Sequence, residues 1–497
     1  MSADGVTGAR LGRRVTAAVI VAVLWGLITH GTYAGSGDEP HYAMIVHSIV
    51  FDRDIDLANN YGDPRALVFG GTLEPGRHAI AGKDGRLRPV HDIGMPLLFA
   101  PYYALVYPLA EWLAEHVPRG LLERARLNGP VILRHFLSLA MIAVTALIGL
   151  RLYDVFLGMS GAPGRAAIWA LLFTLSPPLL SHSFLFFTEI VSAWMVMVVW
   201  TTLRDPVIAT RSALLAGSLT GYLLLVHVRN IGLVAALLAL GVRRYWRAQP
   251  RAGPLVSFVA AAMVFLGFRT LVNHTFWGTW LMTPHARAEW IGSASAMAVE
   301  TAARLPGWVF DQEHGLLAYA PVYLLTLPGL VLLWKHSRRW CVELMFVLAV
   351  YLLPMALPLL NPHGWRGGWS PAARFLVPVV PLLAMAAFFV VTRIGRLPLT
   401  IRALIALQLL LDIVVWLRPK LLWNDGSGAS RLLLFLGGNS RSLTAWAPAM
   451  DPPWSWVTVV GVACASVGWV AWTAWLVWRS PEGPAAGRRV GAARVPE

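Results

Sequence analysis

The chain has 497 residues, of which 57% are hydrophobic and 13% are charged, and 23 of them are Trp. This composition excludes an assembly of soluble domains and indicates a chain that lies mostly inside a lipid bilayer. The formal net charge of +15 does not indicate nucleic-acid binding, because Lys and Arg of membrane proteins gather in cytoplasmic loops. The two cysteines, Cys341 and Cys464, offer neither a disulfide framework nor a cysteine-based metal site.

Apolar runs bounded by charged residues predict about twelve (11–13) membrane-spanning helices. They fall near residues 15–34, 130–150, 166–182, 188–203, 213–227, 230–242, 254–272, 316–334, 341–360, 374–392, 400–417 and 456–478. A further apolar run, residues 93–113, contains three prolines, and we expect it to dip into the outer leaflet as a re-entrant segment. The expected fold class is an all-α polytopic membrane protein, with a transmembrane domain over residues 1–480 and a disordered cytoplasmic tail over 481–497.

The distribution of charge predicts the orientation of the chain. If residues 93–113 do not cross, the segments on one side hold 21 of the 41 Lys and Arg residues but only 5 of the 26 acidic residues. By the positive-inside rule this side is cytoplasmic. We therefore expect a multi-pass protein of the plasma or inner membrane with both termini in the cytoplasm. Residues 35–129 then form a long first extracytoplasmic loop, and the active face is extracytoplasmic.

The motif Gly-Asp-Glu-Pro-His-Tyr, residues 37–42, directly follows the first span. Two adjacent carboxylates are costly to desolvate where a helix leaves the membrane, which marks Asp38 and Glu39 as candidate functional residues. An alternative is that Asp38 only caps the next helix, with Pro40 in its first turn. The apolar stripe within residues 40–51 predicts an amphipathic helix that lies along the membrane surface.

An Asp-rich segment follows this helix. Asp52, Asp54 and Asp56 alternate as in the opening of a calcium-binding loop, but Leu57 stands where that loop needs Gly, and Asp63 where it needs Glu. A solvated turn is the alternative. The sequence establishes no cofactor. A divalent metal ion at these three aspartates is one hypothesis, and a less favoured one is that Asp38 or Glu39 helps to bind a metal.

The first helix, the Asp-Glu-Pro-His-Tyr motif, the surface helix and the Asp-rich turn together resemble the GT-C superfamily of membrane glycosyltransferases. Residues 184–189, 310–321 and 367–376 extend the resemblance to about residue 392. Relatives in this superfamily include protein O-mannosyltransferases and the aminoarabinose transferases that modify lipid A. The resemblance implies a GT-C-like fold and transfer of a sugar from a polyprenyl-phosphate donor to a hydroxyl of an extracytoplasmic glycan, lipid or protein.

This transfer requires a base for the acceptor proton and cations for the departing phosphate. Asp38 and Glu39 are the candidates for the base, and the sequence does not separate them. Arg366, Arg374 and Arg229 are candidates for the phosphate, because a guanidinium binds phosphate with two hydrogen bonds; an arginine that only reaches for lipid headgroups is the alternative. The other residues expected to bind substrate are His41, Tyr42, Glu189 and His314. We expect inversion at the anomeric carbon, because the phosphate and the attacking oxygen lie on opposite faces.

A transporter or flippase for a lipid-linked or small polar substrate is the competing function, since it would share the number of helices and the intramembrane charges. A ligase that moves a whole glycan from a lipid carrier is a third hypothesis. The sequence lacks an internal repeat and has a large acidic first loop, which favours an enzyme over a carrier built from duplicated halves. Neither a Walker loop nor a Gly-x-Gly-x-x-Gly fingerprint occurs, which fits a donor held by its lipid and phosphate.

Overall fold

The computed structural model describes residues 3–30, 37–69, 73–76, 78–248, 252–281, 293–358, 364–424, 426–440, 442–450 and 453–480. Within these ranges the chain is predominantly helical, with one two-stranded antiparallel sheet. The tail for which the sequence predicts disorder, residues 481–497, lies outside the described residues.

The first part of the chain contains α1 (Ala3–His30), α2 (Glu39–His47), β1 (Ala79–Ala81), β2 (Leu87–Pro89), α3 (Gly94–His116) and α4 (Arg119–Ala125). The middle part contains α5 (Gly129–Ser160), α6 (Pro163–Thr174), α7 (Leu179–His182), α8 (Thr188–Thr202), α9 (Thr210–Val226), α10 (Ile231–Trp246) and α11 (Ala252–Trp277). The last part contains α12 (Ala294–Phe310), α13 (Thr326–His336), α14 (Arg338–Ala356), α15 (Val380–Arg393), α16 (Leu399–Leu417), α17 (Arg431–Leu436) and α18 (Trp456–Trp478). A π-helical turn (Ser48–Asp52) extends α2, and short 3-10 turns link other elements, among them Val228–Asn230 and Arg374–Val379.

Eight helical segments among the described residues are long and apolar enough to cross a membrane: Val6–His30, Gly94–His116, Gly129–Ser160, Ala252–Trp277, Arg338–Ala356, Arg374–Arg393, Leu399–Leu417 and Trp456–Trp478. An apolar helix of about 20 residues matches the roughly 30 Å thickness of a bilayer core. The protein is therefore an all-α polytopic membrane protein, as the sequence predicted. Other predicted crossings fall on the shorter helices α6, α8, α9, α10 and α13, so the number of about twelve stays a prediction. The placement of α3 in the outer leaflet also stays one, because α3 is long enough to span.

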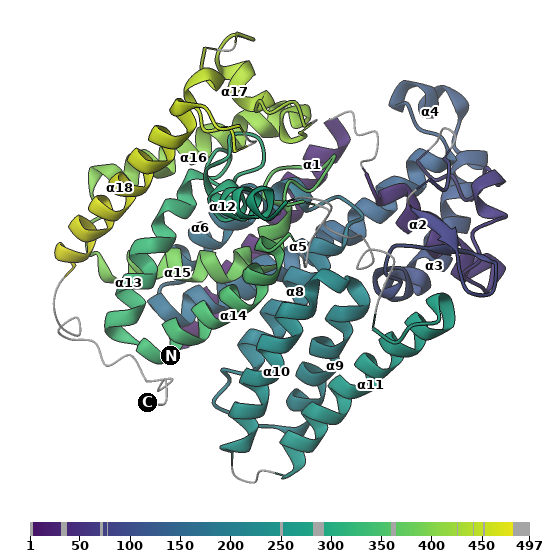
Figure 1. The fold of residues 1–497 in the computed structure, drawn as a ribbon, viewed down its shortest axis with the longest axis horizontal. Coiled ribbons are helices and arrows are strands. Elements are labelled where there is room, and N and C mark those ends of the chain that lie inside the picture. Colours follow the sequence, from purple (N-terminus) through teal and green to yellow (C-terminus); the bar gives the residue numbers. More distant parts are fainter. Residues whose placement is uncertain are drawn as a thin grey trace.

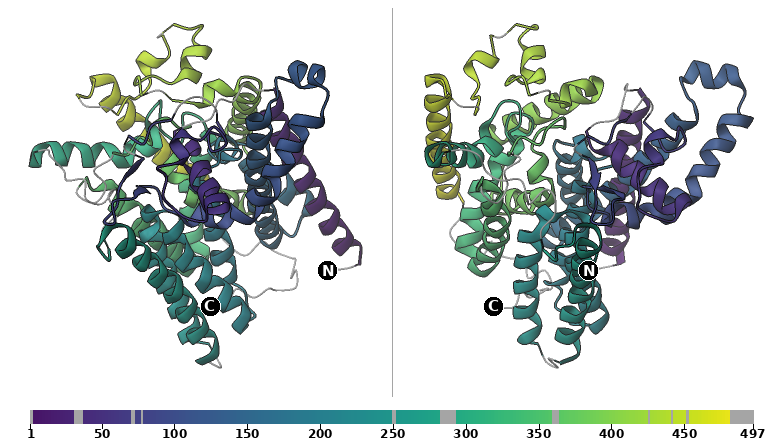
Figure 2. Two further views of the ribbon diagram at one scale, coloured as in Figure 1. Left: turned by 90° about the vertical axis from the view of Figure 1, so that its right-hand side faces the viewer. Right: turned by 45° about the vertical axis from the view of Figure 1, so that its right-hand side comes forward.

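The helices pack side by side into a bundle (Figure 1). Helices α8 to α11 form one group, α13, α14, α15 and α18 lie beside it, and the first loop with α2, α3 and α4 lies at the opposite edge (Figures 1 and 2). The segment Arg374–Arg393 is central, since 89% of its most apolar stretch is buried, whereas only 11% of that of α18 is buried. The segment that carries Arg374 is thus enclosed by protein, and α18 exposes its apolar side chains at the edge.

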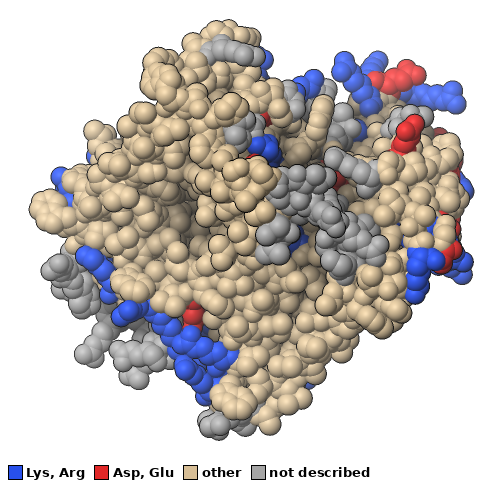
Figure 3. Space-filling view, viewed as in Figure 1, with Lys and Arg blue, Asp and Glu red and all other residues tan. Residues whose placement is uncertain are grey.

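One end of the bundle is basic. Lys and Arg gather along the lower edge of the face in Figure 3, near the lower ends of α10 and α14. The last turn of α10 contains Arg243 and Arg244, and Glu343 in α14 pairs with Arg204 at 2.7 Å and with Arg339 at 3.1 Å. This concentration of positive charge at one end is typical of the cytoplasmic side of a membrane protein.

Small residues allow α9 and α11 to approach closely. Gly217 and Gly221 are four residues apart and therefore lie on one face of α9. A Cβ atom at either position would overlap the backbone carbonyl of Phe258 or Ala262 in α11. Helices in a bilayer associate through such close backbone packing, because lipid tails remove the hydrophobic driving force between helices.

The first loop is built round α2 and a β-hairpin. The hairpin turn contains Gly85 at a φ of +76°, and the strands pair with Ala79 opposite Pro89 and Ala81 opposite Leu87. The expected helix over residues 40–51 is present, because the π-helical turn Ser48–Asp52 continues α2. The structure corrects the expectation that this helix exposes a polar face. Every residue of α2 except Pro40 is buried, and the His41 ring packs against the His78 ring beside the hairpin. The position of the helix along the membrane surface stays a prediction.

Candidate functional site

The two adjacent carboxylates of the first loop point to different partners. Gly37 adopts a φ of +46°, a conformation that glycine enters without steric cost, and the chain then turns into α2. Asp38 stands at the N-cap position but makes no side-chain capping bond. Its Oδ2 instead accepts a hydrogen bond from Nη2 of Arg374 at 2.8 Å. Glu39 is 0% exposed, and its Oε1 accepts a hydrogen bond from the backbone N–H of Phe186 at 2.7 Å.

Arg374 is the centre of the site. Its Nη2 donates to Asp38, its Nε donates to Oε1 of Glu189 at 2.6 Å, and its Nη1 donates to the carbonyl of Gly367 at 3.0 Å. The guanidinium carbon lies 4.5 Å from the centre of the Phe187 ring. Each guanidinium nitrogen is therefore engaged by protein, and Arg374 ties the first loop to the start of α8.

Glu189 links this arginine to a second one. Its Oε1 also accepts a hydrogen bond from Nη1 of Arg229 at 3.4 Å, and the Glu189 side chain is only 2% exposed. The Arg229 guanidinium stacks over the ring of Phe375 at 4.1 Å. Asp38, Arg374, Glu189 and Arg229 form a chain of alternating charges with no net charge. Buried ions require such pairing, because an isolated charge in a low-dielectric interior is very costly.

The electrostatics keep the carboxylate of Asp38 ionised. Burial acts to raise the pKa of Asp38, but the Arg374 guanidinium beside it, helped by His91, holds that pKa well below its usual range. The Asp38 side chain is nonetheless 23% exposed. It is the one member of the four-residue chain whose side chain exceeds 20% exposure, since Arg374, Glu189 and Arg229 are 7%, 2% and 19% exposed.

His41 and Tyr42 line the same part of the first loop. His41 is 4% exposed, and its Nδ1 shares a hydrogen bond with the hydroxyl of Tyr61 at 3.1 Å. Burial, with His78 next to it, lowers the pKa of His41 to about 3, so its imidazole is neutral at physiological pH. Tyr42 is 1% exposed, with its ring centre 5.0 Å from that of His91. Both residues are thus close to Asp38 in the fold as well as in the sequence.

His314 and Arg366 belong to a neighbouring cluster round Trp365. The His314 ring meets the Trp365 ring edge-on at 6.0 Å, and the Arg366 guanidinium lies 5.1 Å from the centre of the same tryptophan. The backbone N–H of Ala373 donates to the carbonyl of His314 at 2.9 Å, which fixes this cluster one residue from Arg374. The structure therefore places these two predicted residues beside the four-residue ion-pair chain and not within it.

The Asp-rich segment is held by hydrogen bonds within its own turn and by one to strand β2. Asp54 accepts from the hydroxyl of Ser48 at 3.1 Å, Asp56 accepts from the backbone N–H of Leu87 at 3.1 Å, and Asp52 accepts from the side-chain amide of Asn60 at 2.6 Å. These contacts are what the alternative, a turn rich in Asp and Asn, requires. The hypothesis of a metal ion at Asp52, Asp54 and Asp56 stays a prediction.

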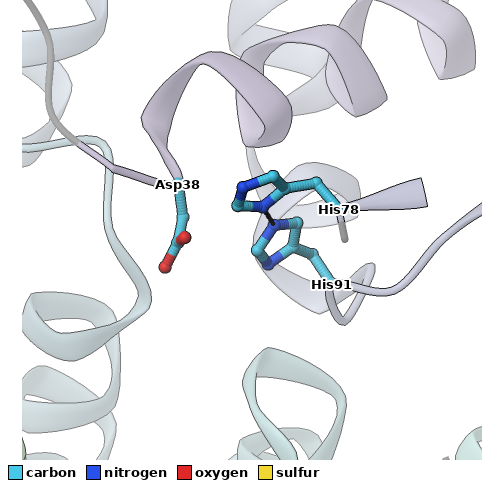
Figure 4. Close-up of side chains that lie close together, drawn as sticks. All are labelled: Asp38, His78 and His91. Carbon is cyan, nitrogen blue, oxygen red and sulfur yellow. Dashed lines mark hydrogen bonds between the residues drawn. The ribbon is translucent and has the colours of Figure 1, made fainter. Parts of the chain in front are cut away.

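The described residues contain one group of three side chains whose potential metal-ligating atoms all lie within 4.8 Å of one another: Asp38, His78 and His91. Figure 4 shows the Asp38 carboxylate on one side and the two imidazoles, joined by a hydrogen bond, on the other. The bond between His78 Nδ1 and His91 Nε2 is 2.9 Å long. The candidate catalytic carboxylate thus faces a pair of histidines that the hairpin supplies.

Comparisons with known proteins give one distant structural match. Neither a family model nor a curated protein matches the chain. The archaeal oligosaccharyltransferase AglB from Archaeoglobus fulgidus, solved in complex with an inhibitory peptide and a dolichol-phosphate, matches over 95% of this chain with 11% identity and a TM-score of 0.36. The chain spans only 56% of that protein's length. A likeness this distant decides neither the activity nor the substrate, which have to be argued from the site itself.

Several residues that complete the site were not among those predicted. Asp92 forms a buried ion pair with Arg269 of α11 and accepts a hydrogen bond from the backbone N–H of Val228 at 2.6 Å, so it fixes the loop that carries Arg229. His78 could have been found, because the Asp-Gly pair before Arg86 is a common hairpin turn and such a hairpin brings His78 and His91 together. No local pattern predicts the pairing of Asp92 with a residue 177 positions away.

Proposed function

We propose that this protein is an integral membrane glycosyltransferase that transfers a sugar from a polyprenyl-phosphate donor to a hydroxyl of an extracytoplasmic glycan, lipid or protein. The observation that carries the proposal is the placement of Asp38. An ionised, 23% exposed carboxylate is held at a fixed position by a buried guanidinium, as a residue that accepts a substrate proton requires. The resemblance of residues 37–42 to the GT-C motif points to the same chemistry.

Asp38 is the better candidate for the base, and Glu39 is better suited to positioning. Glu39 is enclosed and bound to the backbone of Phe186, so it joins α2 to the segment that precedes α8. Asp38 has one oxygen on Arg374 and retains the other for an acceptor hydroxyl. Its low pKa is compatible with this role, because the attacking hydroxyl becomes strongly acidic once its oxygen has begun to bond to the anomeric carbon.

Arg366 is the candidate that best suits the donor phosphate. Arg374 is engaged by Asp38, Glu189 and Gly367, so we assign it the orientation of Asp38. Arg366 is partly exposed and lies in the loop of residues 364–368, beside the carbonyl that Arg374 binds. We expect inversion of configuration, which follows when the phosphate and the acceptor hydroxyl lie on opposite faces of the anomeric carbon.

The proposed topology places this site outside the cytoplasm. The basic end of the bundle, formed by the ends of α10 and α14, supports a cytoplasmic location for that end. The start of α1 lies toward the lower side of the molecule, and α18 runs downward to its end (Figures 1 and 2), which supports two cytoplasmic termini. The donor would then enter from the bilayer with its phosphate at the outer surface.

The direct test is a transfer assay with purified protein. The protein is incubated with a panel of synthetic prenyl-phosphate monosaccharides and with glycan, lipid and peptide acceptors, and products are detected by mass spectrometry. We expect transfer from at least one donor, a product of inverted anomeric configuration by NMR, and a rate at least about 100-fold lower for Asp38→Asn. Asp63→Asn is the matched control, because Asp63 lies in the same loop and pairs with Arg65 at the surface.

Two results would overturn the proposal. One is an Asp38→Asn variant that is folded and transfers at the rate of the wild type. The other is movement of intact donor across vesicle membranes, without cleavage of its sugar-phosphate bond under any acceptor condition. That second result would favour the transporter or flippase.

A further inference from the structure

The hairpin of the first loop brings two histidines together. Strands β1 and β2 pair up to Ala79 opposite Pro89, and the backbone N–H of Val90 donates to the carbonyl of His78 at 3.0 Å. The pairing therefore continues beyond the strands, so that His78 and His91 leave the hairpin next to each other. Their ring nitrogens, Nδ1 of His78 and Nε2 of His91, are 2.9 Å apart.

Aromatic neighbours fix the two rings in this orientation. The His41 ring stacks on the His78 ring with centres 3.9 Å apart and an angle of 14° between the planes. The Tyr42 ring lies against His91 at 5.0 Å. Both of these neighbours come from α2, the helix that Asp38 precedes. Helix α2 thus orients the two imidazoles through His41 and Tyr42, and its N-cap residue Asp38 places the carboxylate beside them.

The spacing of the three groups is close to that of a metal-ligand set. Nitrogen and oxygen ligands bind Zn²⁺ at about 2.0–2.2 Å, which places neighbouring ligand atoms of a tetrahedral site roughly 3.3–3.5 Å apart. The two imidazoles are already at 2.9 Å, and the carboxylate lies within 4.8 Å of both. To bring its carboxylate oxygen to the spacing of a tetrahedral site, Asp38 must move about 1–1.5 Å toward the two imidazoles. The carboxylate oxygen that does not bind Arg374 can make this shift while the other oxygen keeps its hydrogen bond to the guanidinium.

The donor types select the class of ion. Two imidazole nitrogens and one carboxylate oxygen suit Zn²⁺ and related divalent transition metals, whereas Ca²⁺ and Mg²⁺ prefer ligand sets made of oxygen. Three protein ligands leave the fourth tetrahedral position open for water or a substrate oxygen. The charge is also favourable, since Glu39, Glu189 and Asp92 lie within the same part of the fold and oppose Arg374, Arg229 and Arg269.

We propose that Asp38, His78 and His91 form a binding site for one divalent transition-metal ion of the zinc class, with an open coordination position that faces substrate. The site is assigned from the side-chain geometry alone and holds whether or not the sugar-transfer proposal is correct. If both are correct, His78 and His91 would hold the ion at the oxygen of Asp38 that the acceptor hydroxyl also approaches.

The test measures metal binding directly on the full-length protein. The protein is purified in detergent through a tag without histidines, stripped with a chelator, and titrated with Zn²⁺ and with Co²⁺. We expect one equivalent of tightly bound ion by elemental analysis, and the visible absorption of a four-coordinate Co²⁺ site. His78→Ala and His91→Ala should each weaken binding at least about tenfold, since even changes to the residues behind a ligand cost 10–100-fold.

Two further variants separate loss of a ligand from loss of fold. His78→Gln retains a hydrogen-bonding side chain and removes the imidazole, so it should keep the melting temperature of the wild type and still lose the ion. His116→Ala removes an exposed histidine of α3 and should bind one equivalent as the wild type does.

The proposal is overturned if the wild type binds no stoichiometric ion, or if folded His78→Gln and His91→Ala retain wild-type affinity and Co²⁺ absorption. In that case the hydrogen bond between the two imidazoles is structural. Because the readout is binding, a failure here leaves the transfer assay unaffected. A failure of the transfer assay likewise leaves metal binding to be observed.

Discussion

Removal of the Arg374 side-chain charge tests how much the buried ion pairs of the site contribute to stability. In Arg374→Met the carboxylates of Asp38 and Glu189 lose hydrogen bonds of 2.8 Å and 2.6 Å. Glu189, only 2% exposed, retains one longer contact to Arg229 at 3.4 Å. Removing one partner of a buried ion pair costs about 3–5 kcal/mol, because the remaining charge stays desolvated without its counterion.

We expect Arg374→Met to lower the free energy of unfolding by about this amount. The free energy is measured by detergent titration that unfolds the protein reversibly, with intrinsic tryptophan fluorescence as the probe. The double variant Glu189→Gln with Arg374→Met should lose less than the sum of the two single variants, because neither charge of that pair is left alone.

The matched control is Arg65→Met, which breaks an ion pair with Asp63 whose arginine side chain is 73% exposed. Exposed pairs contribute little, so this variant should unfold as the wild type does. The reasoning is refuted if Arg374→Met is as stable as Arg65→Met, or if the losses of the Glu189 and Arg374 variants are simply additive.

The remaining predictions concern the first loop. Glu39→Gln should lower stability by about 1–3 kcal/mol, because the bond to the Phe186 N–H is weakened in a buried place; an unchanged melting temperature would show that Glu39 does not join α2 to that segment. Burial, opposed by the charges of Asp52 and Asp63, lowers the pKa of His47, which is 2% exposed. The unfolded chain therefore takes up a proton below about pH 6.5 that the folded protein resists, and stability falls as pH drops from 7.5 to 5.5. His47→Gln should reduce that fall in melting temperature, and an identical pH profile would contradict the assignment.

The sequence predicted the class of fold because that class depends on composition and on long apolar runs. The apolar runs 254–272 and 456–478, for example, form the helices Ala252–Trp277 and Trp456–Trp478. In a bilayer, a single segment can satisfy all of its backbone hydrogen bonds only as a helix. The prediction that the helix over residues 40–51 exposes a polar face was wrong for a related reason. Periodicity shows that a helix has an apolar stripe, but it does not show that His41 and Ser48, on the other face, become buried by protein.

The candidate site was predicted as separate residues. Asp38, Glu189, Arg229 and Arg374 each stood out as charges close to apolar runs, and the structure joins them into one chain of ion pairs. The pairing of these charges depends on contacts between residues up to 336 positions apart. No pattern in a single sequence encodes such pairing. The same limit explains why the sequence left Asp38 and Glu39 equivalent, although one is partly exposed and the other is enclosed.

The proposed mechanism requires that the carboxylate of Asp38 receives the acceptor proton during sugar transfer. It is tested most directly by the single-turnover rate of purified Asp38→Asn on the best prenyl-phosphate donor, with the melting temperature measured on the same sample. We expect a rate at least about 100-fold below that of the wild type at an unchanged melting temperature, and Asp63→Asn should be as fast as the wild type. A folded Asp38→Asn that turns over at the wild-type rate would contradict it.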